Sequence, residues 1–192
     1  MTVGGERLAV SGEQAAPKSS AARRALAVAL GAATVALAAQ VAVPLPFTPV
    51  PMTLQPLAVL VVGGLLGARL GAAALVVYLA LGALGLPVFT PVGLPGAARL
   101  LGPTGGYLLA YPVAAAMTGW LAARTPARTL VACAAGMVVI HAGGSAQLAI
   151  LTGDLGTATR FGLVPFLTGD LLKIGLAALV ILALGPAVRS RF

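Results

Sequence analysis

Two ionisable residues of opposite sign stand within a long apolar stretch of the chain. The segment FLTGDLLKIGLAALVILAL, residues 166–184, contains Asp170 and Lys173. Each such residue costs about 2.5 to 3.5 kcal/mol at the centre of a membrane-spanning helix. At this spacing the two side chains share one face of a helix. A buried ion pair seldom adds net stability, because desolvation offsets the attraction. We therefore interpret the pair as part of a binding site rather than as a structural contact.

His141 and Ser145 form a second pair whose spacing could serve chemistry. They stand one helical turn apart, so the histidine could activate the serine as a nucleophile. No acidic residue lies near them in the sequence to orient the histidine, and the G-x-S-x-G pattern of serine hydrolases is absent. We favour a structural role for both side chains and keep an intramembrane hydrolase using Ser145 as an alternative.

The segment GEQAAPKS, residues 12–19, comes close to the phosphate-binding pattern G-x-x-x-x-G-K-[ST]. Its second glycine position holds Pro17, which has no N–H to donate to a phosphate, and no strand precedes the segment. We therefore expect the chain to have no nucleotide site of its own.

The amino-acid composition indicates whether these residues lie in a water-soluble domain or in a membrane. Of the 192 residues, 59% are hydrophobic and only 8% are charged, whereas average soluble domains have about 25% charged residues. A bilayer is the environment that suits so much apolar surface. The net charge of +8 comes from basic residues scattered singly between apolar segments. This pattern indicates membrane orientation and not nucleic-acid binding.

Charges and prolines divide the apolar chain into six predicted spans, each needing about 20 apolar residues. Prolines in VPLPFTPVPMT end the first helix near Val43, and the second starts near Thr53. Arg69, in the glycine-flanked LLGARLGAA, marks a tight connection between the second and third helices. The helices are predicted to run approximately over residues 24–43, 53–69, 70–85, 107–123, 129–151 and 164–184. The broken segment 86–106 and the polar segment 152–162 are predicted to be loops.

The basic residues orient this six-span prediction. One side of the membrane would carry nine of them: Arg7, Lys18, Arg23, Arg24, Arg69, Arg124, Arg128, Arg189 and Arg191. The other side would carry Arg99 and Arg160, and Lys173 fits neither face. By the positive-inside rule, both termini are cytoplasmic in a multi-pass protein of the cell membrane. The predicted organisation is a mobile cytoplasmic tail (1–22), a six-helix substrate-binding membrane domain (23–186) and a cytoplasmic C-terminal tail (187–192), with the external 86–106 loop closing a pocket.

A stripe of small residues lies at the start of the first predicted helix. Ala25, Ala29 and Ala33 are four residues apart, and small residues at this spacing let another helix approach closely. Packing within this chain and docking of a partner protein are equally compatible with the pattern.

Four long segments resemble the BioY family. They are LPFTPVPMTLQPLAVLVVG (45–63), YLALGALGLPVF (78–89), LLGPTGGYLLAYP (100–112) and VPFLTGDLLKIGLAAL (164–179), and the resemblance extends over about residues 23–185. BioY proteins are the biotin-specific S components of energy-coupling-factor (ECF) vitamin transporters. The resemblance implies high-affinity biotin capture from outside the cell. It also implies a complex with a transmembrane coupling subunit and two ATPase subunits. Because capture of biotin breaks no bond, we expect a transporter subunit and not an enzyme, with no cofactor and no metal.

The resemblance also assigns roles to residues. It implies that Asp170 and Lys173 bind biotin, that the external loop helps to close the pocket, and that the Ala25, Ala29 and Ala33 stripe docks on the coupling subunit. Loop contacts transfer less directly, because TPVGLPGAAR, residues 90–99, departs from the more glycine-rich family pattern. The predicted substrate-binding set is Asp170, Lys173, Gln55, Phe89, Arg99 and Tyr107.

The chemistry of biotin suits such a set. An aspartate can accept hydrogen bonds from the ureido N–H groups, and a lysine can donate to the ureido oxygen or to the carboxylate tail. We expect Asp170 and Lys173 at the ureido end and the tail near Arg99. The helix start in GPTGGY, residues 102–107, either is a simple cap or faces an anionic group. Another vitamin, such as thiamine or riboflavin, is the alternative substrate, since S components share a fold and differ in their pockets.

Overall fold

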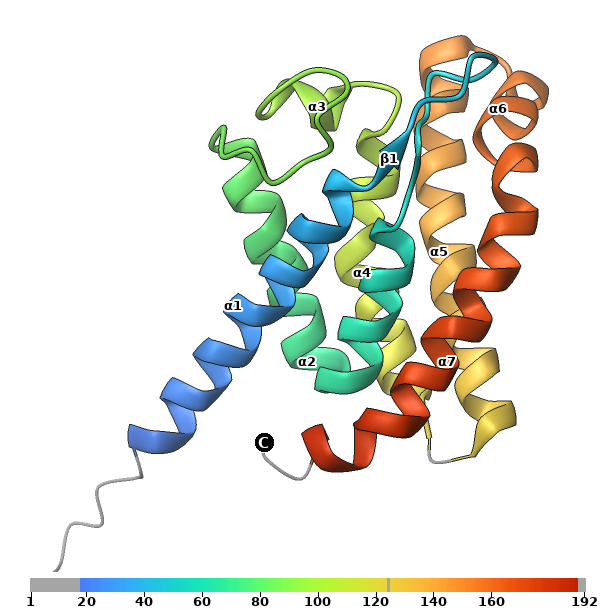
Figure 1. Ribbon diagram of the computed structural model, residues 1–192. Coiled ribbons are helices and arrows are strands. Elements are labelled where there is room, and N and C mark those ends of the chain that lie inside the picture. Colours follow the sequence, from blue (N-terminus) through green and yellow to red (C-terminus); the bar gives the residue numbers. More distant parts are fainter. Residues whose placement is uncertain (1–17, 124, 190–192) are drawn as a thin grey trace, which may run out of the picture.

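The computed structural model describes residues 18–123 and 125–189 and shows a bundle of helices (Figure 1). Its helices are α1 (Lys18–Gln40), α2 (Gln55–Ala83), α3 (Ala98–Leu101), α4 (Gly105–Leu121), α5 (Pro126–Thr152), α6 (Leu155–Gly162) and α7 (Leu167–Arg189), with a 3-10 turn η1 (Val164–Phe166). Two short strands, β1 (Ala42–Val43) and β2 (Met52–Thr53), pair antiparallel. The predicted all-α class is confirmed, and the two strands are a small addition to it.

Helix α2 is a hairpin of two helices. At Gly67 the backbone takes φ 79° and ψ 174°, a region essentially restricted to glycine. The chain reverses at this residue, so that Gly71 packs against the backbone of Gly63. Figure 1 shows the first half of α2 descending and the second half returning. Arg69 is exposed beside the turn, as the predicted tight connection requires.

This reversal accounts for six spans. Four segments are long and apolar enough to cross a membrane: Ser20–Gln40, Gln55–Ala83, Pro126–Thr152 and Leu155–Arg189. Because α2 reverses at Gly67, the second of them supplies two crossings. Helix α4 adds the sixth with 17 residues, at the short end of the usual range of about 17 to 25.

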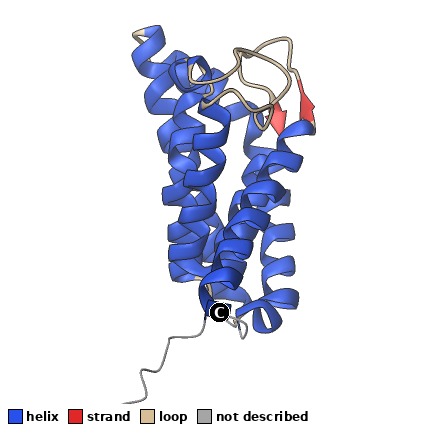
Figure 2. Ribbon diagram, turned by 90° about the vertical axis from the view of Figure 1, so that its left-hand side faces the viewer, coloured by secondary structure: helices blue, strands red, loops and turns tan. Residues whose placement is uncertain are grey.

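The two ends of the bundle are built differently. At one end lie the β1–β2 hairpin, the segment 84–104 with α3, and the α6–η1 connection; we call this the loop end. At the other lie the start of α1, the turn at Gly67, the α4–α5 connection and the end of α7; we call this the terminal end. Figure 2 shows the strands and long loops gathered at the loop end.

The segment 152–162 was predicted to be a loop, and this prediction is wrong over residues 155–162, which form α6. The Asp154 carboxylate accepts hydrogen bonds from the backbone N–H groups of Gly156 (3.3 Å) and Thr157 (2.6 Å). An aspartate in this position is a favoured helix N-cap, because it satisfies N–H groups that have no partner within the helix. The local capping signal therefore outweighs the polar composition of the segment.

The helices at both ends of the chain are longer than predicted. Helix α1 begins at Lys18, so residues 18–22 of the expected tail are helical, and α7 continues through Pro186 to Arg189. Alanine, lysine and arginine in KSSAARR favour a helix. Residues 1–17 and 190–192 lie outside the described part, as does most of the segment that resembles a phosphate loop.

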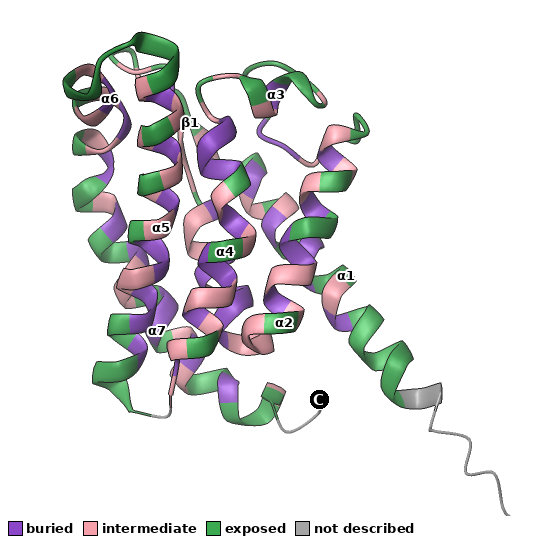
Figure 3. Ribbon diagram, turned by 180° about the vertical axis from the view of Figure 1, so that it is seen from behind, coloured by how far each residue is buried: buried purple, intermediate pink, exposed green. Residues whose placement is uncertain are grey.

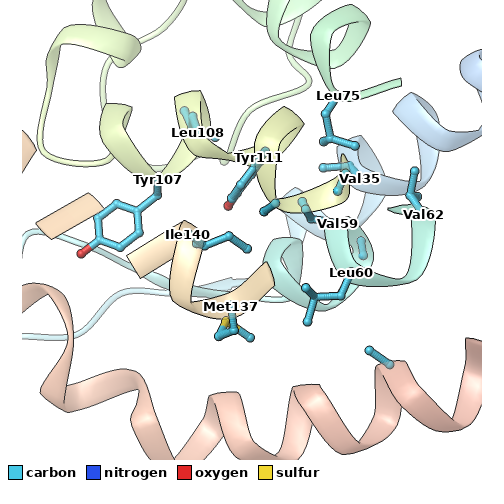
Figure 4. Packing of buried hydrophobic residues seen from close by; sticks show 14 of the residues in the cluster. Val35, Val59, Leu60, Val62, Leu75, Tyr107, Leu108, Tyr111, Met137 and Ile140 are labelled. Atoms are coloured by element: carbon cyan, nitrogen blue, oxygen red, sulfur yellow. The ribbon is translucent and has the colours of Figure 1, made fainter. Parts of the chain in front are cut away.

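A continuous apolar core joins α1, α2, α4 and α5. Figure 4 shows side chains from these helices meeting around Leu60, Leu75 and Ile140, all fully buried. The outer surface is apolar as well: Trp120 is 75% exposed and Ile150 is 81% exposed, and exposed residues cover the outer helix faces in Figure 3. Apolar surfaces inside and outside are what a bilayer-embedded bundle requires.

Candidate binding site

The loop end of the bundle contains a cavity of about 560 Å³, counting its opening to solvent. The wall is formed by the β1–β2 hairpin, the start of α2, the loop with α3, α4, α5, η1 and α7. Its lining includes all six predicted substrate-binding residues: Gln55, Phe89, Arg99, Tyr107, Asp170 and Lys173. The fold thus brings together residues that are up to 118 positions apart in the sequence.

An ion pair on α7 forms the charged part of the cavity wall. Lys173 Nζ donates to Asp170 Oδ1 at 2.9 Å, and the two side chains are 9% and 5% exposed. The i, i+3 spacing on a helix permits this contact, as the sequence predicted. No other hydrogen bond joins the Lys173 ammonium to the described residues. The remaining two N–H groups of the ammonium are therefore available to a ligand.

Sequence reasoning missed the third member of this cluster. The Asp170 Oδ2 atom lies 2.6 Å from His141 Nε2, although the two residues are 29 positions apart. Periodicity along α5 could not reveal this contact, because it depends on how α5 and α7 pack. Ser145 lines a different groove, and within the described residues no hydrogen bond links it to His141. The nucleophile–base contact that the hydrolase alternative needs is therefore missing there.

Arg99 is buried, at 5% exposure, and organises the loop that covers the cavity. Its guanidinium donates from Nε to Leu94 O (2.6 Å), from Nη1 to Thr90 Oγ1 (2.7 Å) and Val92 O, and from Nη2 to Thr90 O (2.8 Å). These bonds use four of its five N–H groups. Burial lowers the pKa of this guanidinium. No carboxylate pairs with it among residues 18–123 and 125–189, so the cavity holds a buried cation without a counter-ion.

Gln55, at the start of α2, belongs to a small polar network beneath Phe89. Gln55 Nε2 donates to the Tyr78 hydroxyl at 2.6 Å, and Thr53 Oγ1 donates to Gln55 Oε1 at 3.2 Å. The rings of Tyr78 and Phe89 meet edge to face, with centroids 5.5 Å apart. This network fixes the Gln55 amide and leaves one of its N–H groups for a ligand.

Tyr107 ties α4 to the end of α6, because its hydroxyl donates to Gly162 O at 2.6 Å. The turn before α4 is held from α5, where Gln147 Nε2 donates to Leu100 O (2.9 Å) and Gly102 O (2.8 Å). The GPTGGY segment is thus a supported helix start whose Thr104 also lines the cavity.

Other lining residues were not predicted. Tyr111 lies one turn after Tyr107 on the same face of α4, and this spacing is a signal that could have identified it. Figure 4 shows Tyr107 and Tyr111 projecting from that helix. The remaining unpredicted lining side chains with polar or aromatic groups are Thr53, Thr90, Thr104, His141 and Phe166.

The alanine stripe lies on the surface of the bundle. Ala25, Ala29 and Ala33 are exposed, whereas Val35 and Ala39 on another face of α1 are fully buried. Packing within this chain, one of the two interpretations left open, would have buried the stripe. Its role in docking stays a prediction.

A mostly apolar cavity that contains a few buried charged groups, inside an apolar six-span bundle, defines a membrane-embedded small-molecule binding protein of the transporter type. Comparison with known proteins then gives the family: a model of the BioY family matches residues 12–190. The chain belongs to the BioY family. The resemblance found in the sequence is confirmed, and the chain is a member of a transporter family and not an enzyme.

Individual relatives agree with this membership. The chain is 40% identical over 142 residues to a biotin transporter BioY of Thermotoga maritima, covering 73% of this chain and 83% of that protein. It is 38% identical over 147 residues to a biotin transporter BioY of Rhizobium etli, covering 71% and 78%. The fold matches the 2.1 Å crystal structure of the S-component for biotin from an ECF-type ABC transporter, with a TM-score of 0.79 and 28% identity, covering 88% of this chain and 94% of that chain.

Proposed function

We propose that this chain captures biotin in the loop-end cavity and serves as the biotin-specific S component of an ECF-type transporter. The observation that carries the proposal is the cavity itself. Asp170 and Lys173 enter it from α7 and the unpaired Arg99 cation enters it from α3, while Phe89, Tyr107 and Ile140 supply apolar and aromatic walls. Biotin likewise combines a polar ureido ring, an apolar bicycle and alkyl chain, and a carboxylate.

The charges favour one orientation of the ligand. Each oxygen of Asp170 already accepts one hydrogen bond, but a carboxylate oxygen has a second lone pair, which a ureido N–H can use. A second carboxylate beside Asp170 would be repelled in this buried place. The tail carboxylate instead suits Arg99, whose buried charge has no counter-ion among the described residues. Biotin would therefore place its ureido ring at α7 and its tail under the loop.

We further propose the arrangement of the assembly. Exposed basic residues gather at the terminal end, among them Arg24, Arg69 and Arg128, whereas Arg160 lies at the loop end. The positive-inside rule then puts the terminal end and both termini in the cytoplasm. The exposed Ala25, Ala29 and Ala33 stripe would contact a transmembrane coupling subunit that works with two ATPase subunits.

Isothermal titration calorimetry on the detergent-purified chain tests the substrate. Biotin is expected to bind, and thiamine and riboflavin are expected to give no heat. Binding of another vitamin in the absence of biotin binding would overturn the proposal. Biotin amide tests the orientation: Lys173→Met should weaken biotin and its amide alike. If Lys173→Met instead abolishes the discrimination between them, the lysine contacts the tail and the orientation is reversed.

Energy coupling needs a separate measurement. Vesicles containing this chain alone should not accumulate biotin against a gradient, whereas vesicles that also contain the coupling and ATPase subunits should do so with ATP. Concentrative uptake by the chain alone would contradict the dependence on partner ATPases.

A further inference from the structure

A second groove lies beside the substrate cavity, between α5 and α7. It has a volume of about 1,150 Å³, counting open space, and its lining is almost entirely apolar. Val138 and Leu171 on its rim are 67% and 72% exposed, so in a bilayer this groove faces the acyl chains. Of all the residues that line it, His141 and Asp170 also line the substrate cavity. These two side chains therefore form part of the wall between the substrate cavity and the lipid phase.

The hydrogen bonds define the state of this wall. Asp170 Oδ1 accepts from the Lys173 ammonium at 2.9 Å, which favours the ionised carboxylate. An ionised carboxylate can only accept, so His141 Nε2, at 2.6 Å from Oδ2, carries the proton and donates. His141 Nδ1 is buried and has no hydrogen-bond partner among the described residues. The contact with Asp170 is therefore the one hydrogen bond that the His141 ring makes among the described residues.

The imidazole is also held in place by packing. The ring centroids of Tyr107 and Phe166 lie 6.2 Å and 6.4 Å from that of His141, and both rings line the substrate cavity. The His141 side chain is 13% exposed. Its ring thus fills the space between α5 and α7 at the level of Asp170, as well as donating to it.

We propose that His141 is a positioning residue of the binding site with two effects. Its Nε2–H holds one oxygen of Asp170, so that the carboxylate presents a fixed set of lone pairs to the ligand. Its ring, together with the Asp170 side chain, separates the substrate cavity from the lipid-facing groove, so that Lys173 lines the cavity and not the groove. The inference rests on the proposed function, in which Asp170 binds the ureido ring of biotin.

Three substitutions separate the two effects. His141→Gln keeps an N–H donor, His141→Phe keeps a ring without a donor, and His141→Ala removes both. Loss of a charge-assisted hydrogen bond corresponds to about tenfold to hundredfold in affinity. We expect His141→Gln to bind biotin within about threefold of the unsubstituted chain, His141→Phe to bind about tenfold more weakly, and His141→Ala to be weaker still.

Calorimetry with biotin gives the affinities, and thermal unfolding of the ligand-free variants reports their stability. Ser145→Ala is the matched control, because Ser145 lines the groove and not the cavity; its affinity should be unchanged. Unaltered affinity in His141→Phe would overturn the positioning role. Equal affinities of His141→Phe and His141→Ala would overturn the role of the ring as a wall.

A double-mutant cycle distinguishes positioning from direct contact with biotin. If His141 acts through Asp170, His141→Phe should cause little further loss when Asp170→Asn is already present. An equal loss in both backgrounds would contradict this. The unsubstituted chain is measured first. If it does not bind biotin, the proposed function is wrong. If it binds biotin and the His141 variants bind equally well, only the present inference is wrong.

Discussion

The loop end and the terminal end of the bundle are stabilised by different kinds of contact. At the loop end, buried polar groups meet around a cavity: Asp170 with Lys173 and His141, and Arg99 with the loop above them. At the terminal end, glycines let helices touch backbone to backbone. A Cβ on Gly63 would collide with the backbone of Ala115 on α4. Buried charged groups around a cavity distinguish the first region, and close backbone contact between α2 and α4 distinguishes the second.

A basic residue reinforces the terminal end in a way that differs from Arg99. Arg189, at the end of α7, donates to Gly64 O at 2.5 and 3.1 Å and to Ala122 O at 3.3 Å. It thus joins α7 to α2 and to the end of α4 through carbonyl groups, and it lines a groove at the terminal end that is separate from the substrate cavity. Arg99 instead holds a loop in shape over a pocket.

This difference indicates how a ligand can pass. The cavity opens at the loop end, where non-helical backbone lines it. Irregular backbone at membrane depth is tolerated where it lines a cavity or is covered by protein. Toward the terminal end the glycine contacts leave no space between α2 and α4. Under the proposed function, biotin would enter and leave at the loop end without separation of α2 and α4. Release at the terminal side requires a rearrangement of the bundle, which agrees with the proposed dependence on partner subunits.

The largest expected effect comes from removing the charge at the loop end. Asp170→Asn leaves the buried Lys173 without its counter-charge, and breaking a buried ion pair costs about 3 to 5 kcal/mol in folding free energy. The lost charge-assisted bond to biotin corresponds to about a tenfold to hundredfold weaker affinity. Thermal unfolding and calorimetry measure the two effects separately. If neither the unfolding temperature nor the biotin affinity changes, the charged pair is not part of the binding site.

At the terminal end the expected effect is on stability alone. Gly63→Ala forces a methyl group against the Ala115 backbone, which cannot rotate away, and overpacking typically costs about 1 to 3 kcal/mol. Gly175→Ala is the matched control, because nothing lies within 4 Å of a Cβ at Gly175 on α7. We expect a lower unfolding temperature for Gly63→Ala only, with biotin affinity retained by the folded fraction. Equal unfolding temperatures would contradict the close-packed contact.

The same contrast explains what the sequence could predict. The spans, the turn at Arg69 and the Asp170–Lys173 pair depend on local hydropathy, on glycine and on helical spacing, so they could be read from the chain. The contact of His141 with Asp170 depends on how two helices pack, and no periodicity within either helix encodes it. Helix α6 was missed although its capping residue, Asp154, is a local signal.

The next prediction concerns the loop. Arg99→Gln removes the cation and most of the donors that hold residues 90–94, so the loop should close less well and biotin affinity should fall by about tenfold, the value of one charge-assisted contact. The loss should be smaller for biotin amide, which has no carboxylate charge. Arg99→Lys is the control: it keeps the positive charge but lacks the forked N–H donors of the guanidinium. If Arg99→Gln lowers the affinity for biotin and for biotin amide by the same factor, Arg99 only shapes the loop and does not contact the tail.

The smallest effect on the isolated chain is expected on α1, at the terminal end. Ala29 is exposed and lines no described part of the cavity, so Ala29→Trp should leave biotin affinity and unfolding temperature unchanged. In the complete assembly the indole would hold the coupling subunit away from the small-residue surface, and co-purification with it should be lost. Val131→Trp places the same side chain on an exposed position of α5, 63% exposed, and should assemble normally. Since Ala29 cannot reach the ligand, loss of assembly with intact binding would separate docking at the terminal end from capture at the loop end. Assembly of Ala29→Trp at the level of the unsubstituted chain would instead show that the exposed alanines are an ordinary lipid-facing surface.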